Sequence, residues 1–162
     1  MSHVVGIPLR KGNNQEVISC EISPNGTGRA TITEGMAVGS DLGTLKPIVK
    51  PLSEAPDGFV GFIFGISKCN DFYHGSLIQA GTLICLPTAS AAAFTAGDPL
   101  KVNTATGLID AAGTLAINGT IVATSVEQNF PVVGIDGKTG EVIPECVLVS
   151  FGSGRALAAV GP

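Results

Sequence analysis

The densest group of reactive side chains lies between Lys68 and His74, where the chain reads Lys-Cys-Asn-Asp-Phe-Tyr-His. A cysteine nucleophile needs a histidine within hydrogen-bond reach and a third group that orients this base. Cys69, Asp71 and His74 would have to converge in a pocket for this chemistry, yet they share one short segment with no family signature around the cysteine. We therefore interpret the segment as a connecting loop with an exposed histidine and a packed tyrosine.

The other patterns that could bind a metal ion or a nucleotide are incomplete. A structural zinc site needs four ligands, usually in closely spaced pairs, and Cys69 with His74 is the sole local pair. The segment Gly137-Lys138-Thr139 resembles part of a phosphate-binding P-loop, but that motif needs a glycine where this chain has Val132. We therefore predict no metal ion and no cofactor.

Paired carboxylates for glycoside hydrolysis are equally hard to find. The candidates are scattered, and several stand beside glycine or proline, where acidic residues are typical turn formers or solvated loop charges: Glu34, Asp41, Glu54, Asp57, Asp98, Asp110 and Glu141. The chain has no tryptophan and a single tyrosine, so it lacks an aromatic platform on which a sugar could stack. The sequence thus predicts no catalytic residues and a protein that is not an enzyme.

The composition favours association with other proteins. Charged residues make up 14% of the chain, against roughly 25% in an ordinary soluble domain. So weakly solvated a surface indicates an obligate oligomer or a component of a lattice. The alternative is a β-rich monomer whose surface uses serine, threonine and asparagine in place of charge.

The charge pattern and the apolar runs argue against other partners. The net charge is -4, and no basic cluster exists beyond Arg10-Lys11, so we expect no nucleic-acid partner. No apolar run approaches the roughly 18 residues of a membrane span. The N-terminal residues lack a basic and then apolar signal region, so we expect synthesis in a reducing cytoplasm. The four cysteines are then small buried apolar side chains: Cys20, Cys69, Cys85 and Cys146.

Short apolar or alternating runs bounded by turn residues recur along the chain, and no long amphipathic helix pattern occurs. The expected strands are Glu16–Ile22, Arg29–Thr33, Phe59–Lys68, Ser76–Leu86, Pro99–Val102, Gly107–Asp110, Thr114–Glu127 and Val142–Phe151. This spacing predicts an all-β fold, a compact antiparallel β-sandwich or barrel-like domain. An extended N-terminal arm precedes it and a short C-terminal tail follows.

Particular residues refine this expectation. The third expected strand carries Phe62, Phe64 and Ile66 on one face and Val60 and Ile63 on the other, which predicts a central strand buried on both faces.

Turn and breaker residues complete the pattern. Gly81 should break its strand, and the pairs Asn25-Gly26 and Asn118-Gly119 are typical of turns. The proline-containing segment Leu45–Leu52 belongs at a sheet edge or in a loop. Thr88–Phe94 could form one or two helical turns.

The expected organisation has three parts. Residues 1–15 form the arm, residues 16–151 form the β domain, and residues 152–162 form a flexible or docking tail. Two sub-lobes, 16–74 and 75–151, are an option within the β domain. The apolar residues of the arm suit a segment that becomes ordered on a neighbouring subunit, and simple fraying is the alternative.

The segment from Gly75 to Phe151 carries a pattern of glycine-rich turns. It contains Ala-Gly-Thr-Leu, Phe-Thr-Ala-Gly-Asp-Pro-Leu-Lys-Val, Thr-Gly-Leu-Ile-Asp and a final Glu-Cys-Val-Leu-Val-Ser-Phe. In this pattern the chain resembles the small capsid decoration (cement) proteins of tailed bacteriophages. The resemblance covers about half of the chain, and residues 1–74 do not match the pattern.

The resemblance implies a structural role without an active site. Such proteins bind the outer surface of the mature phage head and hold neighbouring major capsid subunits together, often as homotrimers and sometimes as homodimers. It thus implies a chain made in the host cytoplasm and located in the virion. Alternatives are another virion β-module, such as a fibre, tail or receptor-binding component, and a small β-barrel enzyme. We expect contacts to the capsid at Val4, Val5, Ile7, Leu9, Pro47, Ile48 and Pro51.

Overall fold

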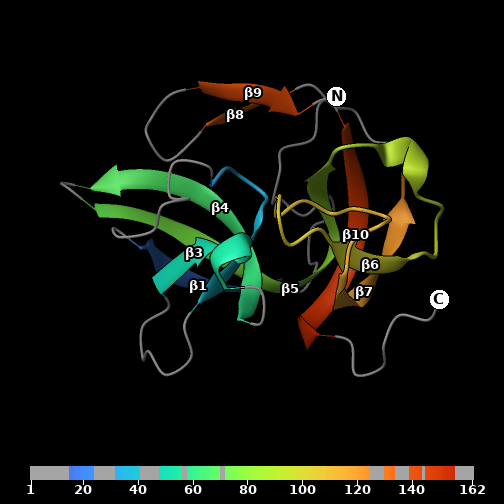
Figure 1. Cartoon of the computed structure of the whole chain (residues 1–162), viewed down its shortest axis with the longest axis horizontal. Helices are drawn as coiled ribbons and strands as arrows, with labels where there is room; N and C mark the ends of the chain where they lie inside the picture. The colour runs from blue at the N-terminus through green and yellow to red at the C-terminus, as the bar shows by residue number, and fades with distance from the viewer. Residues whose placement is uncertain are drawn as a thin grey trace.

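The computed structural model describes residues 15–23, 32–40, 48–55, 58–69, 72–124, 130–133, 139–143 and 145–155. The fold is all-β, as the sequence predicts (Figure 1). The strands are β1 (Gln15–Ile22), β2 (Ala37–Ser40), β3 (Ile48–Pro51), β4 (Phe59–Cys69), β5 (Phe72–Thr88), β6 (Pro99–Val102), β7 (Leu115–Ala123), β8 (Phe130–Val133), β9 (Thr139–Ile143) and β10 (Glu145–Arg155). Two 3-10 turns, η2 (Leu52–Glu54) and η3 (Ala91–Ala93), complete the described elements.

The 17-residue strand β5 is shared by two lobes. It pairs with β1 as far as Gly81 and with β10 from Gly81 onward. Gln15 and Phe151 are both register partners of Gly81. The sequence predicted a strand break at this glycine, and this prediction is wrong: β5 continues, and only its partner changes.

The first lobe is a ring of strands that closes on itself. β5 pairs with β4, β4 with β2, and β2 with β3, all antiparallel. β3 then pairs in parallel with the end of β1, at Glu21 and Ile22, and β1 returns to β5. Such a closed arrangement is a small barrel, whose inward side chains alternate with outward ones. The buried cluster inside it comprises Cys20, Ile22, Ile32, Met36, Val38, Val49, Ile63 and Leu77.

The second lobe repeats the closure with other strands. β5 pairs with β10, β10 with β7, and β7 with β6. Ile109 forms a bridge to Val102 on β6 and another to Thr88 on β5, which closes the ring. The buried hydroxyl of Thr88 donates a hydrogen bond of 2.8 Å to the Ile109 carbonyl, so this closure buries no unpartnered hydroxyl.

One continuous apolar cluster joins the two lobes. It fills the second lobe and extends onto the outer faces of β2 and β4 in the first. Phe62 of β4 lies at the junction, with its ring 5.1 Å from that of Phe151 on β10 and 5.6 Å from that of Phe59, both edge to face. The two lobes therefore share a core. β8 and β9 form a separate two-stranded sheet, drawn apart from the main sheet in Figure 1.

The predicted central strand is β4, and both of its faces carry buried side chains. Phe62 and Phe64 belong to the shared cluster, whereas Ile63 belongs to the barrel interior. Ile66 differs from the prediction, because it packs against the barrel interior and not beside Phe64. The cause is a bulge at Gly65, whose φ is +65°, which shifts the alternation of β4 by one residue.

The bulge of β4 is held by an acidic side chain. The two carboxylate oxygens of Glu34 accept the backbone N–H groups of Gly65 and Ile66, at 2.7 and 2.8 Å. A carboxylate that accepts two amides in this way satisfies donors that the irregular ladder leaves without a strand partner. Glu34 was predicted to be a turn former, and the structure adds this contact with a strand distant in the chain.

Three further expectations need correction, and one is outside the described residues. Asn118-Gly119 lies inside β7 and not in a turn, with Gly119 opposite Phe151. The proline-containing segment forms β3, which lies between β1 and β2 and not at an edge. The segment Val142–Phe151 belongs to two strands, β9 and β10. The turn at Asn25-Gly26 lies outside the described residues.

The carboxylate of Asp110 makes the second lobe sensitive to acid. It accepts the Ala112 N–H at 2.9 Å and the Asn103 side-chain amide at 3.1 Å. These two hydrogen bonds, the backbone one first, lower the pKa of Asp110 below its usual 3.8. Ionised Asp110 therefore stabilises the fold above pH 3.8, and this contribution is lost as pH falls through the lowered value.

We expect Asp110→Asn to cost about 1 kcal/mol or less at neutral pH, because the carboxylate is largely solvated. The difference between variant and wild type should shrink well below pH 3.8. Urea unfolding followed by circular dichroism at both pH values checks this. A difference that stays constant with pH would contradict it.

Candidate interaction surface

The reactive segment singled out from the sequence is the end of the β4–β5 hairpin. Cys69 pairs with Phe72 and Lys68 with Tyr73, while Asp71 and the side chain of Cys69 lie outside the described part. Tyr73 packs against the barrel interior, as predicted, and the Lys68 ammonium lies 5.7 Å from the centre of its ring. His74 is half-buried and not exposed.

The described residues offer no metal site. No group of three or more histidine, cysteine or acidic side chains gathers among them. Burial raises the pKa of Cys20 to about 11, against a smaller opposing effect of a backbone hydrogen bond to Gly75, so this thiol stays protonated at neutral pH. In the described ranges, no helix has the length and the hydrophobicity that a membrane span requires.

Among the described residues, the outer face of the first lobe carries the two most exposed large apolar side chains. Residues paired across a sheet share a face, and side chains alternate along each strand. Since Cys20 and Leu77 face the barrel interior, the opposite face carries what we name the outer strip: Val17, Ser19 and Glu21 on β1 with Phe72, His74 and Ser76 on β5. Phe72 is 50% exposed and Val17 47%.

The outer strip is exposed to solvent because the second lobe covers the adjacent strand β4 and leaves the strip itself uncovered. Phe64 of β4 is the register partner of Ser76, yet Phe64 is buried in the shared cluster. On the β1 side Val17 and Ser19 stay exposed. Ile18 points toward the inside of the ring but is 37% exposed, since β3 pairs with β1 only at Glu21 and Ile22 in the described residues. Two adjacent apolar side chains of β1, Val17 and Ile18, are therefore exposed on its two faces.

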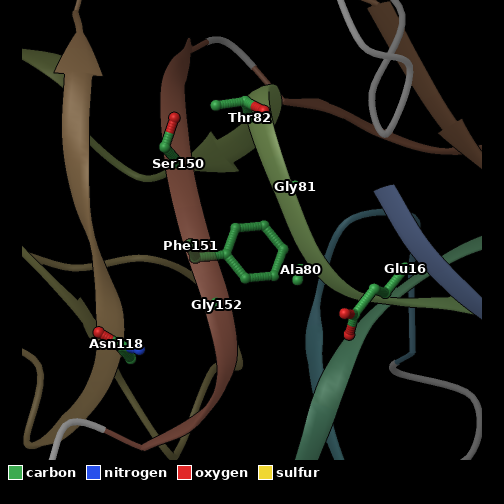
Figure 2. Close-up of a pocket in the computed structure, with 8 residues that line it drawn as sticks. All are labelled: Glu16, Ala80, Gly81, Thr82, Asn118, Ser150, Phe151 and Gly152. Atoms are coloured by element: carbon green, nitrogen blue, oxygen red, sulfur yellow. The ribbon is translucent and has the colours of Figure 1, made fainter. Parts of the chain in front are cut away.

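A groove opens at the end of the outer strip, near Gly81, where β5 changes from pairing with β1 to pairing with β10. Its volume is about 370 Å³. Its lining consists of Glu16, Ala80, Gly81, Thr82, Asn118, Ser150, Phe151 and Gly152. Figure 2 shows the ring of Phe151 beside Ala80 in the middle, with Glu16 at one side and Ser150 and Thr82 at one end.

The groove takes its shape from an irregularity in β5. Between the pairs Val149–Ile84 and Phe151–Gly81 the register shifts, so that β5 has an extra residue opposite Ser150. Leu83 in this stretch has a φ of +53°, and its N–H donates to the Ser150 hydroxyl at 3.3 Å. Of the side chains in the lining, Glu16 alone is charged at neutral pH. This composition suits contact with another chain better than general acid–base chemistry.

The contact residues predicted from the sequence fall mostly outside the described part. Five of them lie outside the described residues: Val4, Val5, Ile7, Leu9 and Pro47. Ile48 is half-buried, and Pro51 is buried, where it pairs with Val38 on β2 and has little surface to offer a partner.

Sequence reasoning missed the apolar residues of the outer strip. The available signal was the adjacent pair Val17-Ile18 in an otherwise alternating strand, and a phenylalanine directly after the polar hairpin turn. The chain was compared with protein-family models, curated proteins and solved structures, and none of the three comparisons found a match.

Proposed function

We propose that this chain is a structural virion protein that binds the outer surface of the mature phage head and holds neighbouring major capsid subunits together. The observation that carries the proposal is the outer strip, where Phe72 and Val17 are about half exposed in a chain with only 14% charged residues. Exposed apolar side chains on a weakly charged surface are typical of protein–protein contacts. The resemblance of the segment Gly75–Phe151 to phage decoration proteins supports a phage capsid as this partner.

The outer strip offers contact features at both of its ends, which suits a protein that binds two capsid subunits at once. A stable interface buries on the order of 1,600 Å² in total, and the hairpin end and the groove lie at the two ends of the outer strip. A protein that contacts two capsid subunits at once gains from effective concentration, because the second contact becomes intramolecular. A homotrimer, or alternatively a homodimer, multiplies this effect at a symmetry axis.

We expect Phe72→Ser to weaken binding to expanded, mature phage heads by at least about 30-fold, because a large aromatic side chain that an interface buries is often worth about 2 kcal/mol or more. The variant should keep the wild-type fold, since half of the Phe72 surface is already in contact with water. Co-sedimentation with purified heads measures the stoichiometry and the apparent affinity.

The matched control is Val122→Ser on β7 in the second lobe. Val122 is 38% exposed and lies outside the outer strip, so its substitution should leave binding unchanged within a few-fold. Wild-type protein that binds neither mature nor precursor heads would overturn the proposed function. Equal losses in both variants would show that the outer strip is not the contact surface.

A receptor-binding virion component is the second candidate, and one observation favours it. A receptor-binding component needs a ligand groove with an aromatic or charged lining, and the groove between β1 and β10 contains Phe151 and Glu16. Retention of the wild-type protein on host cells, with no retention on heads, would select this alternative.

A further inference from the structure

We propose that Cys85 and Cys146 form a reversible intramolecular disulfide in an oxidising medium, which links β5 to the first residues of β10. The inference rests on the packing of the second lobe and is independent of the proposed function.

The register of β5 and β10 brings the two thiols together. Cys85 is opposite Leu148, and Cys146 is opposite Pro87, so the cysteines are diagonal neighbours. Because Cys146 and Leu148 are two residues apart on one strand, both cysteines project from the same face of the sheet. Both have no exposed surface, and their thiols are hydrogen-bonded to each other. Cys20 differs, since it lies in the barrel interior and its thiol interacts with the Gly75 backbone.

Because the two cysteines are diagonal neighbours, their disulfide should be strained and easily reduced, and not a permanent structural cross-link. Diagonal neighbours in a flat sheet have Cα atoms about 7–8 Å apart, whereas a relaxed disulfide has a Cα separation of about 5.5–6 Å. The start of β10 must therefore move toward β5 as the bond forms. The resulting strain favours reduction, which is typical of labile and regulatory disulfides.

The two thiols differ in acidity while they are in contact in the closed fold. The hydrogen bond with Cys146 lowers the pKa of Cys85, and the same contact together with burial raises the pKa of Cys146. The thiolate is the attacking species in thiol–disulfide exchange. We write the exchange with Cys85 attacking first, and the products are the same if Cys146 does so.

The exchange with oxidised glutathione then balances in two steps. The Cys85 thiolate attacks one sulfur of the oxidant, forms a mixed disulfide and releases one glutathione thiolate. Cys146 loses its proton, attacks the Cys85 sulfur and releases the second glutathione. Overall, two protein thiols and one oxidised glutathione become one protein disulfide and two reduced glutathiones.

Burial controls the rate of this reaction. Neither sulfur is accessible in the closed fold, so the oxidant reaches Cys85 only when the start of β10 separates locally from β5. We therefore expect slow oxidation in buffer and faster oxidation in urea below the unfolding midpoint.

The test incubates the purified 162-residue chain with oxidised glutathione, with and without sub-denaturing urea. The remaining thiols are then alkylated and the peptides mapped by mass spectrometry. We expect wild type to lose two of its four alkylatable thiols and to yield one cross-linked peptide pair that joins Cys85 to Cys146 and separates in dithiothreitol. The matched control Cys20→Ser should form the same cross-link, and Cys146→Ser should stop at the glutathione adduct of Cys85.

Because the primary measurement uses wild type, it does not depend on the folding of any variant. Four free thiols after oxidation in urea would overturn the inference. A cross-link that joins another pair of cysteines, or a wild-type product that stops at mixed glutathione adducts, would do the same.

Discussion

Phe62→Ala should lower the free energy of unfolding by about 3–5 kcal/mol, the usual cost of removing a phenylalanine from a packed core. Phe62 has 0% exposed surface, and its ring contacts Phe59 on β4 and Phe151 on β10. Its loss would leave a cavity where the two lobes share their core. Small domains have a total stability of only about 5–15 kcal/mol, so this variant should be close to unfolding at ambient temperature.

Urea denaturation followed by far-ultraviolet circular dichroism suits this measurement, because the chain has no tryptophan and one tyrosine for fluorescence. Phe72→Ala is the matched control, since it removes the same atoms from a side chain that is 50% exposed. We expect the control to lose about 1 kcal/mol or less. Similar losses in the two variants would mean that Phe62 does not occupy the centre of the core.

Gly107→Ala should lower the free energy of unfolding by about 2–5 kcal/mol, the second large effect that we expect. Gly107 has a φ of +73°, a left-handed conformation that costs other residues about 1–2 kcal/mol. An added Cβ would lie 2.9 Å from the Met36 methyl and 3.0 Å from the Ala37 carbonyl oxygen, so overpacking adds about 1–3 kcal/mol. The Gly107 carbonyl also accepts the Ala37 N–H at 2.8 Å, which attaches this turn of the second lobe to β2 of the first.

Gly97→Ala separates the two contributions to this cost. Gly97 has a similarly positive φ of +95°, but a Cβ there would meet nothing within 4 Å. We expect this control to lose only the backbone contribution of about 1–2 kcal/mol. Thermal or urea unfolding of both variants gives the steric part as the difference. If the two substitutions cost the same, the contact between Gly107 and the first lobe is not tightly packed.

The strands with simple local patterns were predictable from the sequence. The predicted strand Pro99–Val102 coincides with β6, and Glu16–Ile22 falls one residue short of β1. One 3-10 turn, η3, lies within the segment for which one or two helical turns were predicted. In each case apolar residues at a period of two, or a short run of alanines, act through neighbours in the chain, and such signals survive without knowledge of the fold.

The errors come from residues whose partners are distant in the chain. Ile66 changes face because the bulge at Gly65 is held by Glu34, which is 32 residues away from it. Gly119 lies in a strand and not in a turn because β10 provides Phe151 opposite it. Local turn propensity is weaker than the hydrogen bonds and packing of a complete ladder, so tertiary context overrides it.

The candidate surface, too, was only partly predictable from the sequence. That the protein should associate with others was expected from its low charge alone. Which residues are available was not, because Val17 and Phe72 have the same apolar character as Ile63 and Leu77, which are buried.

The sequence by itself therefore determined the all-β class, the positions of the regular strands and an unusually uncharged surface, since these follow from composition and local periodicity. The tertiary structure alone decided that β5 serves two rings, that a groove opens at Gly81, and that Cys85 meets Cys146. The physical reason is that strand pairing is a long-range interaction, and the register between distant strands is set by the packing of the whole core.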